Sequence, residues 1–161
     1  MVRVLQRLTR MATRLVRLGA LAFFVTLWAV PASAQMPVGV RAGVSGDPDQ
    51  FYFGAHVESK PLLRNFTFRP NAEVGIGDDT ALVALNFEFA YSIPVRNQPW
   101  RIYLGGGPAV NIYSSEGRDN GGVGGGFNIL LGAQHRGGLF TELKVGMIDS
   151  PNIKFGVGFV F

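Results

Sequence analysis

Few side chains in this sequence of 161 residues could act as nucleophiles, general bases or metal ligands. The chain has no cysteine, which excludes a thiol nucleophile, a disulfide scaffold and a Cys-based metal site. Its two histidines are too few for a His-rich metal centre, and we expect no metal and no cofactor. A serine nucleophile would need a histidine within hydrogen-bond reach and an acid to orient it. His56 falls inside an alternating run and His135 at a turn, away from the serines of other connections (Ser45, Ser114, Ser115 and Ser150). We therefore expect no catalytic residues and no enzymatic activity.

Nine charged residues stand at alternate positions of otherwise apolar segments: Arg41, Glu58, Arg69, Glu73, Glu88, Arg101, Glu142, Lys144 and Lys154. Such spacing places side chains on one face of a β-strand. Opposite charges enclosed in a narrow space of low dielectric pair with each other. We predict a salt-bridge network that closes the interior of a barrel. The alternative is that these residues line a narrow ion path, as in a small passive channel.

The remaining charges divide between two sets of connections. One set carries the aspartates, which could hold a divalent cation at one rim (Asp47, Asp49, Asp78, Asp79, Asp119 and Asp149). The other set carries bases and no acid (Lys60, Arg64, Arg96 and Arg136). Aspartate also favours tight turns, and no D-x-D-x-D-G calcium loop occurs. We favour solvated turn chemistry over a cation site.

The first 34 residues have the order of a secretory signal peptide. Five arginines precede an apolar run from Leu18 to Val30, and Ala32-Ser33-Ala34 forms an A-x-A cleavage site. The apolar run is shorter than the roughly 20 residues of a transmembrane helix. Cleavage after Ala34 would divide the chain into a signal peptide, 1–34, and a mature domain, 35–161. The alternative is an uncleaved membrane anchor or a basic amphipathic helix. The formal charge of +4 then falls to −1, which removes nucleic acid from the expected partners.

The mature domain is a succession of segments in which apolar and polar residues alternate with a period of two, as in β-strands. Eight strands are predicted, at 38–44, 51–58, 66–76, 81–93, 100–113, 123–134, 139–148 and 153–161, separated by turns rich in Gly, Asp, Asn and Pro. None of the residues on the apolar face is charged. An even number of antiparallel strands with a charge-free face predicts an all-β fold, an eight-stranded up-and-down transmembrane β-barrel.

Several residues test this barrel in detail. Eight strands leave an interior that side chains can fill, and inward glycines are expected to make room for long charged side chains (Gly105, Gly107, Gly124, Gly126, Gly156 and Gly158). Pro70 and Pro108 lack a ladder donor, so we expect a β-bulge or a local ladder break at each. Aromatic residues at strand ends on the outer face are typical of interfacial girdles (Phe51, Tyr91, Trp100 and Phe127). The alternative is a soluble lipocalin-like barrel, with its aromatic face turned inward around an apolar ligand.

The last predicted strand carries a more specific resemblance. Apolar residues alternate from Ile153 through Phe155, Val157 and Phe159, and the sequence stops on Phe161. A final strand that ends in Phe, after a signal peptide, resembles bacterial outer-membrane barrels, whose last strand is read by the outer-membrane assembly machinery. The mature domain is similar to small eight-stranded barrels of the OmpA/OmpX type, including opacity-like surface proteins. It departs from OmpA in stopping at strand eight, and from OmpX and the opacity proteins in its short connections.

This resemblance implies the bacterial outer membrane, with the acidic connections outside the cell and the basic ones in the periplasm. We expect a monomeric integral barrel, surrounded by outer-membrane lipid and lipopolysaccharide, with a structural or surface-interaction role. Phe161 is the expected assembly signal, and the assembly machinery the expected partner during biogenesis. A small passive channel is the main alternative, and a lipid-modifying enzyme or a soluble binder is less favoured.

Overall fold

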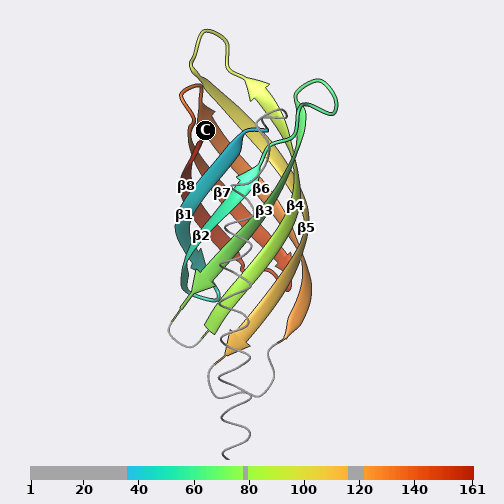
Figure 1. The fold of residues 1–161 in the computed structure, drawn as a ribbon, viewed down its shortest axis with the longest axis vertical. Coiled ribbons are helices and arrows are strands. Elements are labelled where there is room, and N and C mark those ends of the chain that lie inside the picture. Colours follow the sequence, from blue (N-terminus) through green and yellow to red (C-terminus); the bar gives the residue numbers. More distant parts are fainter. Residues whose placement is uncertain (1–35, 78–79, 116–121) are drawn as a thin grey trace, which may run out of the picture. The chain divides into compact units, whose positions relative to one another are not determined.

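Each strand of the computed structural model pairs with the next one along the chain, and the last strand pairs with the first (Figure 1). The structure describes residues 36–77, 80–115 and 122–161, so the predicted signal peptide lies outside the described residues. The strands are β1 (Val38–Gly46), β2 (Gln50–Val57), β3 (Phe66–Ile76), β4 (Thr80–Pro94), β5 (Trp100–Ser115), β6 (Val123–His135), β7 (Leu139–Ile148) and β8 (Ile153–Val160). All eight predicted strands are confirmed, with each end within two residues of the expected position.

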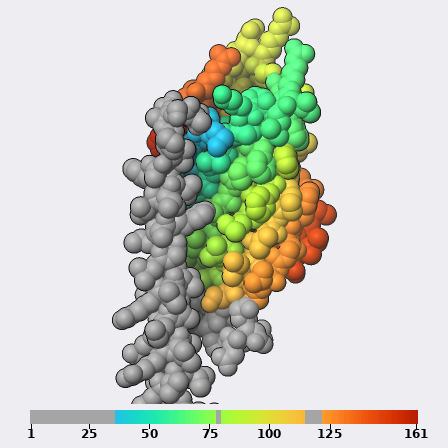
Figure 2. All heavy atoms as spheres, turned by 45° about the vertical axis from the view of Figure 1, so that its right-hand side comes forward, coloured from blue at the N-terminus to red at the C-terminus, as the bar shows by residue number. Residues whose placement is uncertain are grey.

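Antiparallel pairing runs around the whole barrel and leaves no strand edge open. β8 pairs with β1 over eight positions, so that Phe159 lies opposite Val40. The strands cross the outer surface obliquely, as bands of successive colour (Figure 2). Such tilt is required for a sheet to close into a barrel. Among the described residues, no helix is long and apolar enough to cross a bilayer.

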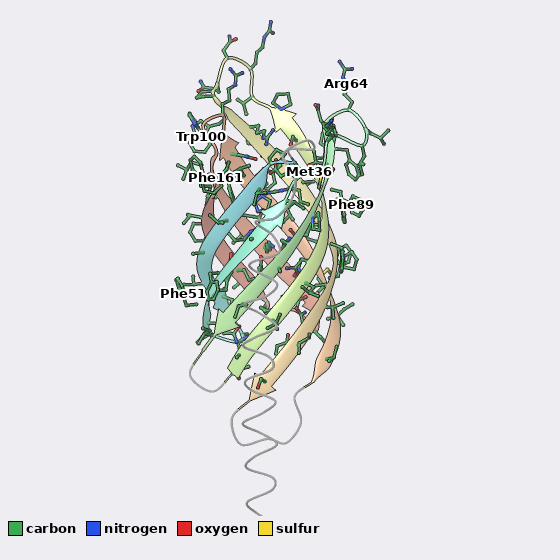
Figure 3. All side chains as sticks on the ribbon, in the orientation of Figure 1. Met36, Phe51, Arg64, Phe89, Trp100 and Phe161 are labelled. Atoms are coloured by element: carbon green, nitrogen blue, oxygen red, sulfur yellow. The ribbon has the colours of Figure 1, made fainter. Side chains whose placement is uncertain are left out.

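Apolar side chains point away from the barrel and charged ones point into it. On β8, Phe155 and Val157 are each 51% exposed, whereas Lys154, the residue before Phe155, is 4% exposed. Phe51, Phe89 and Trp100 likewise project from the outer face (Figure 3). This orientation is the reverse of the lipocalin-like alternative, in which the aromatic side chains would surround a ligand. The alternation of the sequence therefore gives an apolar exterior and a polar lumen.

Both strand prolines interrupt one of the two ladders beside them. The β2–β3 ladder ends at Asn71, next to Pro70, whereas β3 and β4 pair across Pro70 without a gap. At Pro108 the β5–β6 ladder is continuous, but the β4–β5 ladder skips the positions between Ala109 and Gly106. The register is the same on both sides of this gap. The predicted ladder breaks are therefore found, without a bulge. Each proline lacks only its own backbone N–H, which would have bonded to one of the two neighbouring strands.

The connections divide between the two ends of the barrel. We call the end with the C-terminus the C-terminal mouth; it carries the β2–β3, β4–β5 and β6–β7 connections, 58–65, 95–99 and 136–138 (Figure 1). We call the opposite end the far mouth; its described connections are 47–49 and 149–152. The basic residues of the sequence analysis (Lys60, Arg64, Arg96 and Arg136) lie at the C-terminal mouth, and the described acidic ones (Asp47, Asp49 and Asp149) at the far mouth.

Candidate functional site

Five charged side chains from five strands meet in the middle of the lumen. Glu73 accepts hydrogen bonds from Lys144 and Lys154, each at 2.8 Å, and Nη1 of Arg41 lies 3.5 Å from it. Lys144 also donates to Glu88 at 2.7 Å. All five side chains are buried. Because an isolated buried ion is costly, these mutual contacts are what makes a charged interior compatible with folding.

Glu142 on β7 joins this central cluster to a second layer nearer the C-terminal mouth. Its carboxylate accepts hydrogen bonds from Arg41 at 2.6 Å, from Arg69 at 3.4 Å and from the Tyr103 hydroxyl at 2.9 Å. The Arg69 guanidinium also lies 4.6 Å from the centre of the Tyr103 ring, a cation–π arrangement. Three donors around one carboxylate fix its position between the two layers.

A row of asparagines extends the network from β6 to β4 and β3. Asn128 donates to Asn86 at 2.8 Å, Asn86 donates to Asn71 at 2.6 Å, and Asn71 donates to Glu88 at 2.7 Å. Each amide thus donates to the next member, and the row ends on a carboxylate that is also bound to a lysine. Satisfied polar networks of this kind hold buried side chains in one arrangement.

Solvent does not reach the middle of this lumen. Glu88 is 0% exposed, Glu73 and Lys144 are each 1% exposed, and Tyr103 is 1% exposed. A water-filled path along the barrel axis would leave these inward side chains accessible. The nine charged residues singled out in the sequence all lie on the inside or at the C-terminal mouth, and their pairs close the lumen between the two mouths.

The lumen glycines correct one expectation from the sequence. The sequence predicts that they make room for long charged side chains, but two of them lie under inward aromatic rings. A Cβ at Gly156 would overlap Tyr52, and one at Gly158 would overlap Phe140. At Gly105 and Gly107 a Cβ would instead overlap backbone oxygens of β4. The reason is that a ring beside a strand needs more lateral space than an extended lysine or arginine, so small residues are required opposite the rings.

Sequence reasoning gave no role to Tyr52 and Phe140. Both are fully buried in the lumen, where Lys154 lies 5.3 Å from the Tyr52 ring centre and Arg41 lies 5.6 Å from that of Phe140. Their positions follow the inward phase of β2 and β7, which is the signal that could have placed them.

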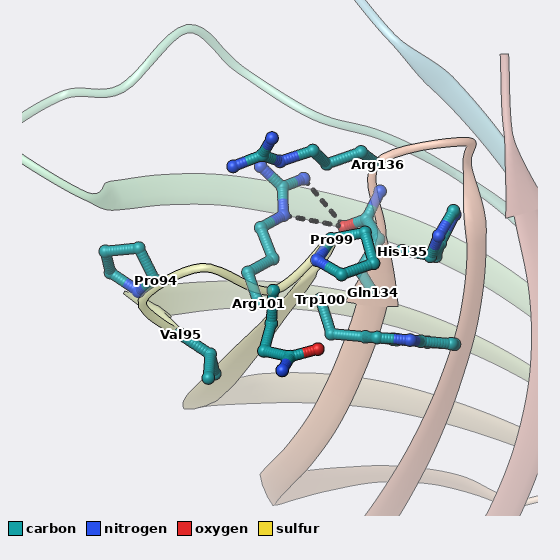
Figure 4. A pocket seen from close by; sticks show the side chains of 9 residues that line it. Pro94, Val95, Pro99, Trp100, Arg101, Gln134, His135 and Arg136 are labelled. Carbon is teal, nitrogen blue, oxygen red and sulfur yellow. Dashed lines mark hydrogen bonds between the residues drawn. The ribbon is translucent and has the colours of Figure 1, made fainter.

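The C-terminal mouth carries exposed cations. Arg101, whose side chain is 46% exposed, donates to Gln134 at 2.7 and 3.3 Å and lies 3.4 Å from Glu58. Glu58 also contacts Arg69 at 3.3 Å and His56 at 3.6 Å, which links the mouth to the layer below. A recess of about 330 Å³ opens between the β4–β5 and β6–β7 connections (Figure 4).

The far mouth is covered by the β7–β8 connection. Ser150 is 6% exposed and its neighbour Pro151 is fully buried. Asn111 donates to the Asp149 carbonyl at 2.6 Å and to the Ser150 hydroxyl at 3.1 Å, and the Tyr113 hydroxyl donates to the same carbonyl at 2.7 Å. Glycines make this fit possible, because a Cβ at Gly126 would overlap Ser150.

The acidic rim residues that the structure describes do not gather around one point. Asp47 accepts a hydrogen bond from Asn152 at 2.6 Å, and among the described residues no group of three His, Cys, Asp or Glu side chains could hold a metal ion. Asp78, Asp79 and Asp119 lie outside the described residues.

Comparison with known proteins separates fold from sequence. No protein-family model and no curated protein sequence matches the chain. Three crystal structures have the same fold at low identity. The N-terminal β-barrel domain of Pseudomonas aeruginosa OprF is 16% identical, with a TM-score of 0.54 over 79% of this chain and 98% of that one. Neisserial surface protein A is 12% identical, with a TM-score of 0.53 over 78% and 96%.

The third structure is that of the outer membrane enzyme PagL, at 9% identity and a TM-score of 0.52 over 78% of this chain and 98% of that one. Enzymes and non-enzymes thus share this architecture, so the fold does not determine a role. The chain is an eight-stranded antiparallel β-barrel whose structure matches the OmpA-like barrels of bacterial outer membranes.

Proposed function

We propose that the protein is an integral barrel of the bacterial outer membrane, with a lumen closed by ion pairs and a structural or surface-interaction role. The observation that carries this proposal is the division of the barrel wall, with an exposed apolar exterior and buried ion pairs inside. In lipid every backbone group must be paired within the protein, and a closed barrel meets this condition. An exterior of this kind in water would instead favour aggregation.

The proposed partners follow from the location. Outer-membrane lipid and lipopolysaccharide would contact the apolar exterior, and the assembly machinery would read the last strand with Phe161. The basic connections of the C-terminal mouth would face the periplasm and the far mouth the outside. We propose a monomer, because the ladder is closed and no strand edge is left for a second copy.

A non-enzymatic role is supported by the surroundings of the two histidines. In the part of the chain that the structure describes, His56 lies in the lumen beside Arg69 and Glu58. His135, at the C-terminal mouth, accepts a hydrogen bond from the Gly137 amide and packs against Trp100. Ser45 and Ser150 lie at the far mouth. An activity towards lipid substrates in detergent, absent in a Ser150→Ala variant, would overturn this part of the proposal.

Refolding tests the membrane location directly. The protein is unfolded in urea, diluted into detergent or into buffer alone, and run on SDS gels with and without boiling. We expect a folded species only with detergent, and a band that shifts on boiling because the closed ladder resists SDS until it is heated. A protein that stays soluble and folded without detergent, with no heat-dependent shift, would contradict the proposal.

A further inference from the structure

The C-terminal mouth holds two adjacent recesses that share the same cations. The first, of about 330 Å³, is lined by Trp100, Arg101 and Arg136 together with Pro94, Val95 and Pro99. The second, of about 530 Å³, opens over the lumen and is lined by Arg101, Arg136 and Lys60, with Glu58 as its acidic side chain and Phe161 at its edge. Arg101 and Arg136 therefore stand where the two recesses meet (Figure 4).

Positive charge at this junction is only partly compensated. Glu58 is shared among Arg101, Arg69 and His56. Among the described residues, Arg136 has no carboxylate within 4.0 Å. Its backbone amide donates to the Pro99 carbonyl at 2.9 Å, which ties its turn to the β4–β5 connection and fixes the base of its side chain. Arg136 thus brings a second guanidinium to recesses in which Arg101 already shares Glu58 with Arg69 and His56, and this excess of positive charge favours an anion.

The walls of the first recess indicate the rest of the ligand. Trp100 packs edge-on against His135, with ring centres 5.1 Å apart, and the prolines and Val95 complete an apolar lining. A recess of this size accommodates a small organic group. Apolar walls also lower the local dielectric and strengthen charge pairing.

From these contacts we propose that the C-terminal mouth binds a phosphate ester, with its phosphate between Arg101 and Arg136 and its organic part against Trp100. Phosphate oxygens can accept from two guanidinium groups at once, here from Arg136 and from the N–H groups of Arg101 that do not donate to Gln134 or Glu58. The ester could be a soluble one or the headgroup of an anionic phospholipid. The site goes beyond the proposed function, and only its lipid form rests on a membrane location.

The test follows the amide signals of Gln134, Gly137 and Gly138 by NMR in a neutral detergent, with the full chain. Glycerol 3-phosphate and dihexanoylphosphatidylglycerol are the two phosphate-bearing probes, and dihexanoylglycerol lacks the phosphate. We expect saturable shifts with at least one phosphate probe and none with dihexanoylglycerol. Stronger binding of the phospholipid assigns the site to a lipid headgroup, and stronger binding of glycerol 3-phosphate assigns it to a soluble ester.

Matched substitutions distinguish specific binding at this site from a general attraction of anions to the positive charge of the mouth. Arg136→Gln should weaken binding about tenfold or more, since a charge-assisted hydrogen bond contributes about 1.5–3 kcal/mol. Arg101→Lys keeps the charge but removes a guanidinium that can donate to Gln134 and to an anion at the same time, and should weaken binding as well. Arg64→Gln removes the same charge from the β2–β3 connection, outside both recesses (Figure 3), and should change binding less than about twofold.

The inference is overturned if Arg64→Gln and Arg136→Gln weaken binding equally, if dihexanoylglycerol gives the same shifts, or if no probe saturates. The heat-dependent gel shift is measured on each variant. If the protein shows this shift but no saturable binding, the binding site is contradicted and the proposed function is not. If the parent protein shows no shift, the proposed function is contradicted.

Discussion

Glu73 is the residue on which the central ion pairs converge. It accepts hydrogen bonds from Lys144 and Lys154 and lies beside Arg41, with a side chain 1% exposed. Glu73→Gln leaves three buried cations short of one negative charge. We expect the free energy of unfolding to fall by about 3–5 kcal/mol, as when one partner of a buried pair is removed. Urea-induced unfolding in lipid vesicles, followed by the heat-dependent gel shift, measures this loss.

Glu58→Gln is the matched control for that experiment. Glu58 also has several basic neighbours, but it lies at the C-terminal mouth, and its partner Arg101 is 46% exposed. Water can reach the Arg101 end of this interaction but not its Arg69 end, so we expect a loss smaller than that of Glu73→Gln, about 1–3 kcal/mol. Equal losses for both variants would contradict the assignment of Glu73 as the centre of the network.

Two glycines of β6 test whether the inward rings set the size of their neighbours. A Cβ at Gly132 would overlap the buried Tyr103 ring, whereas a Cβ at Gly125 meets nothing within 4 Å. Gly132→Ala should destabilise the barrel by about 1–3 kcal/mol through overpacking. Gly125→Ala should be neutral or stabilise by up to about 1 kcal/mol, because alanine loses less backbone entropy than glycine on folding. The same unfolding assay compares them, and equal effects would rule out the packing argument.

At the scale of elements, the period of two was enough to place the strands and to sort each side chain inside or outside. Arg69 and Glu73 lie in the lumen because they share the phase of β3, and Phe68 and Val74 lie outside for the same reason. Ion-pair partners could not be predicted in this way. Lys144 meets Glu73 across 71 residues of sequence, and that contact depends on how far each tilted strand is shifted around the closed barrel.

The cover of the far mouth could not be predicted from the sequence either. The β7–β8 connection reads as an ordinary turn, and its burial depends on space that Gly126 and Gly146 leave beside it on β6 and β7. Runs of glycine in a strand indicate close approach, but they do not say what approaches.

Asn111 holds this cover, and its removal should loosen the β7–β8 connection without unfolding the barrel. Asn111→Ala removes the donor to Asp149 and Ser150, although the Tyr113 hydroxyl still donates to Asp149. We expect faster hydrogen exchange of the Gly146 amide, which donates to the Asn152 carbonyl at 3.1 Å. Amides of β3 and β4 at the opposite wall are the internal reference and should keep their protection. Unchanged exchange at Gly146 would show that the cover does not depend on Asn111.

At the scale of the whole molecule, the polar groups form three zones along the barrel. The far mouth is covered by a loop, the middle is filled by ion pairs and asparagines, and the C-terminal mouth is open and basic. Different side chains hold each zone in place, so substitutions can loosen the cover of the far mouth and the ion pairs of the middle separately. Closure in the middle, where side chains are 0–1% exposed, is therefore expected to decide whether ions pass.

Planar-bilayer recordings test whether the central ion pairs, rather than the cover of the far mouth, stop ions from passing. We expect no unit conductance from the parent protein, and none from Asn111→Ala, because the central pairs remain. Glu88→Ala removes the acceptor of Lys144 and Asn71, each at 2.7 Å, from the most buried point of the network. Lys144 then loses one of its compensating charges, and its hydration should draw water into the space left by the carboxylate, giving a small measurable conductance. Glu58→Ala, at the open mouth, is the control and should stay silent. Reproducible conductance from the parent protein would favour the channel instead, and silence from a correctly folded Glu88→Ala barrel would show that the central pairs do not control closure.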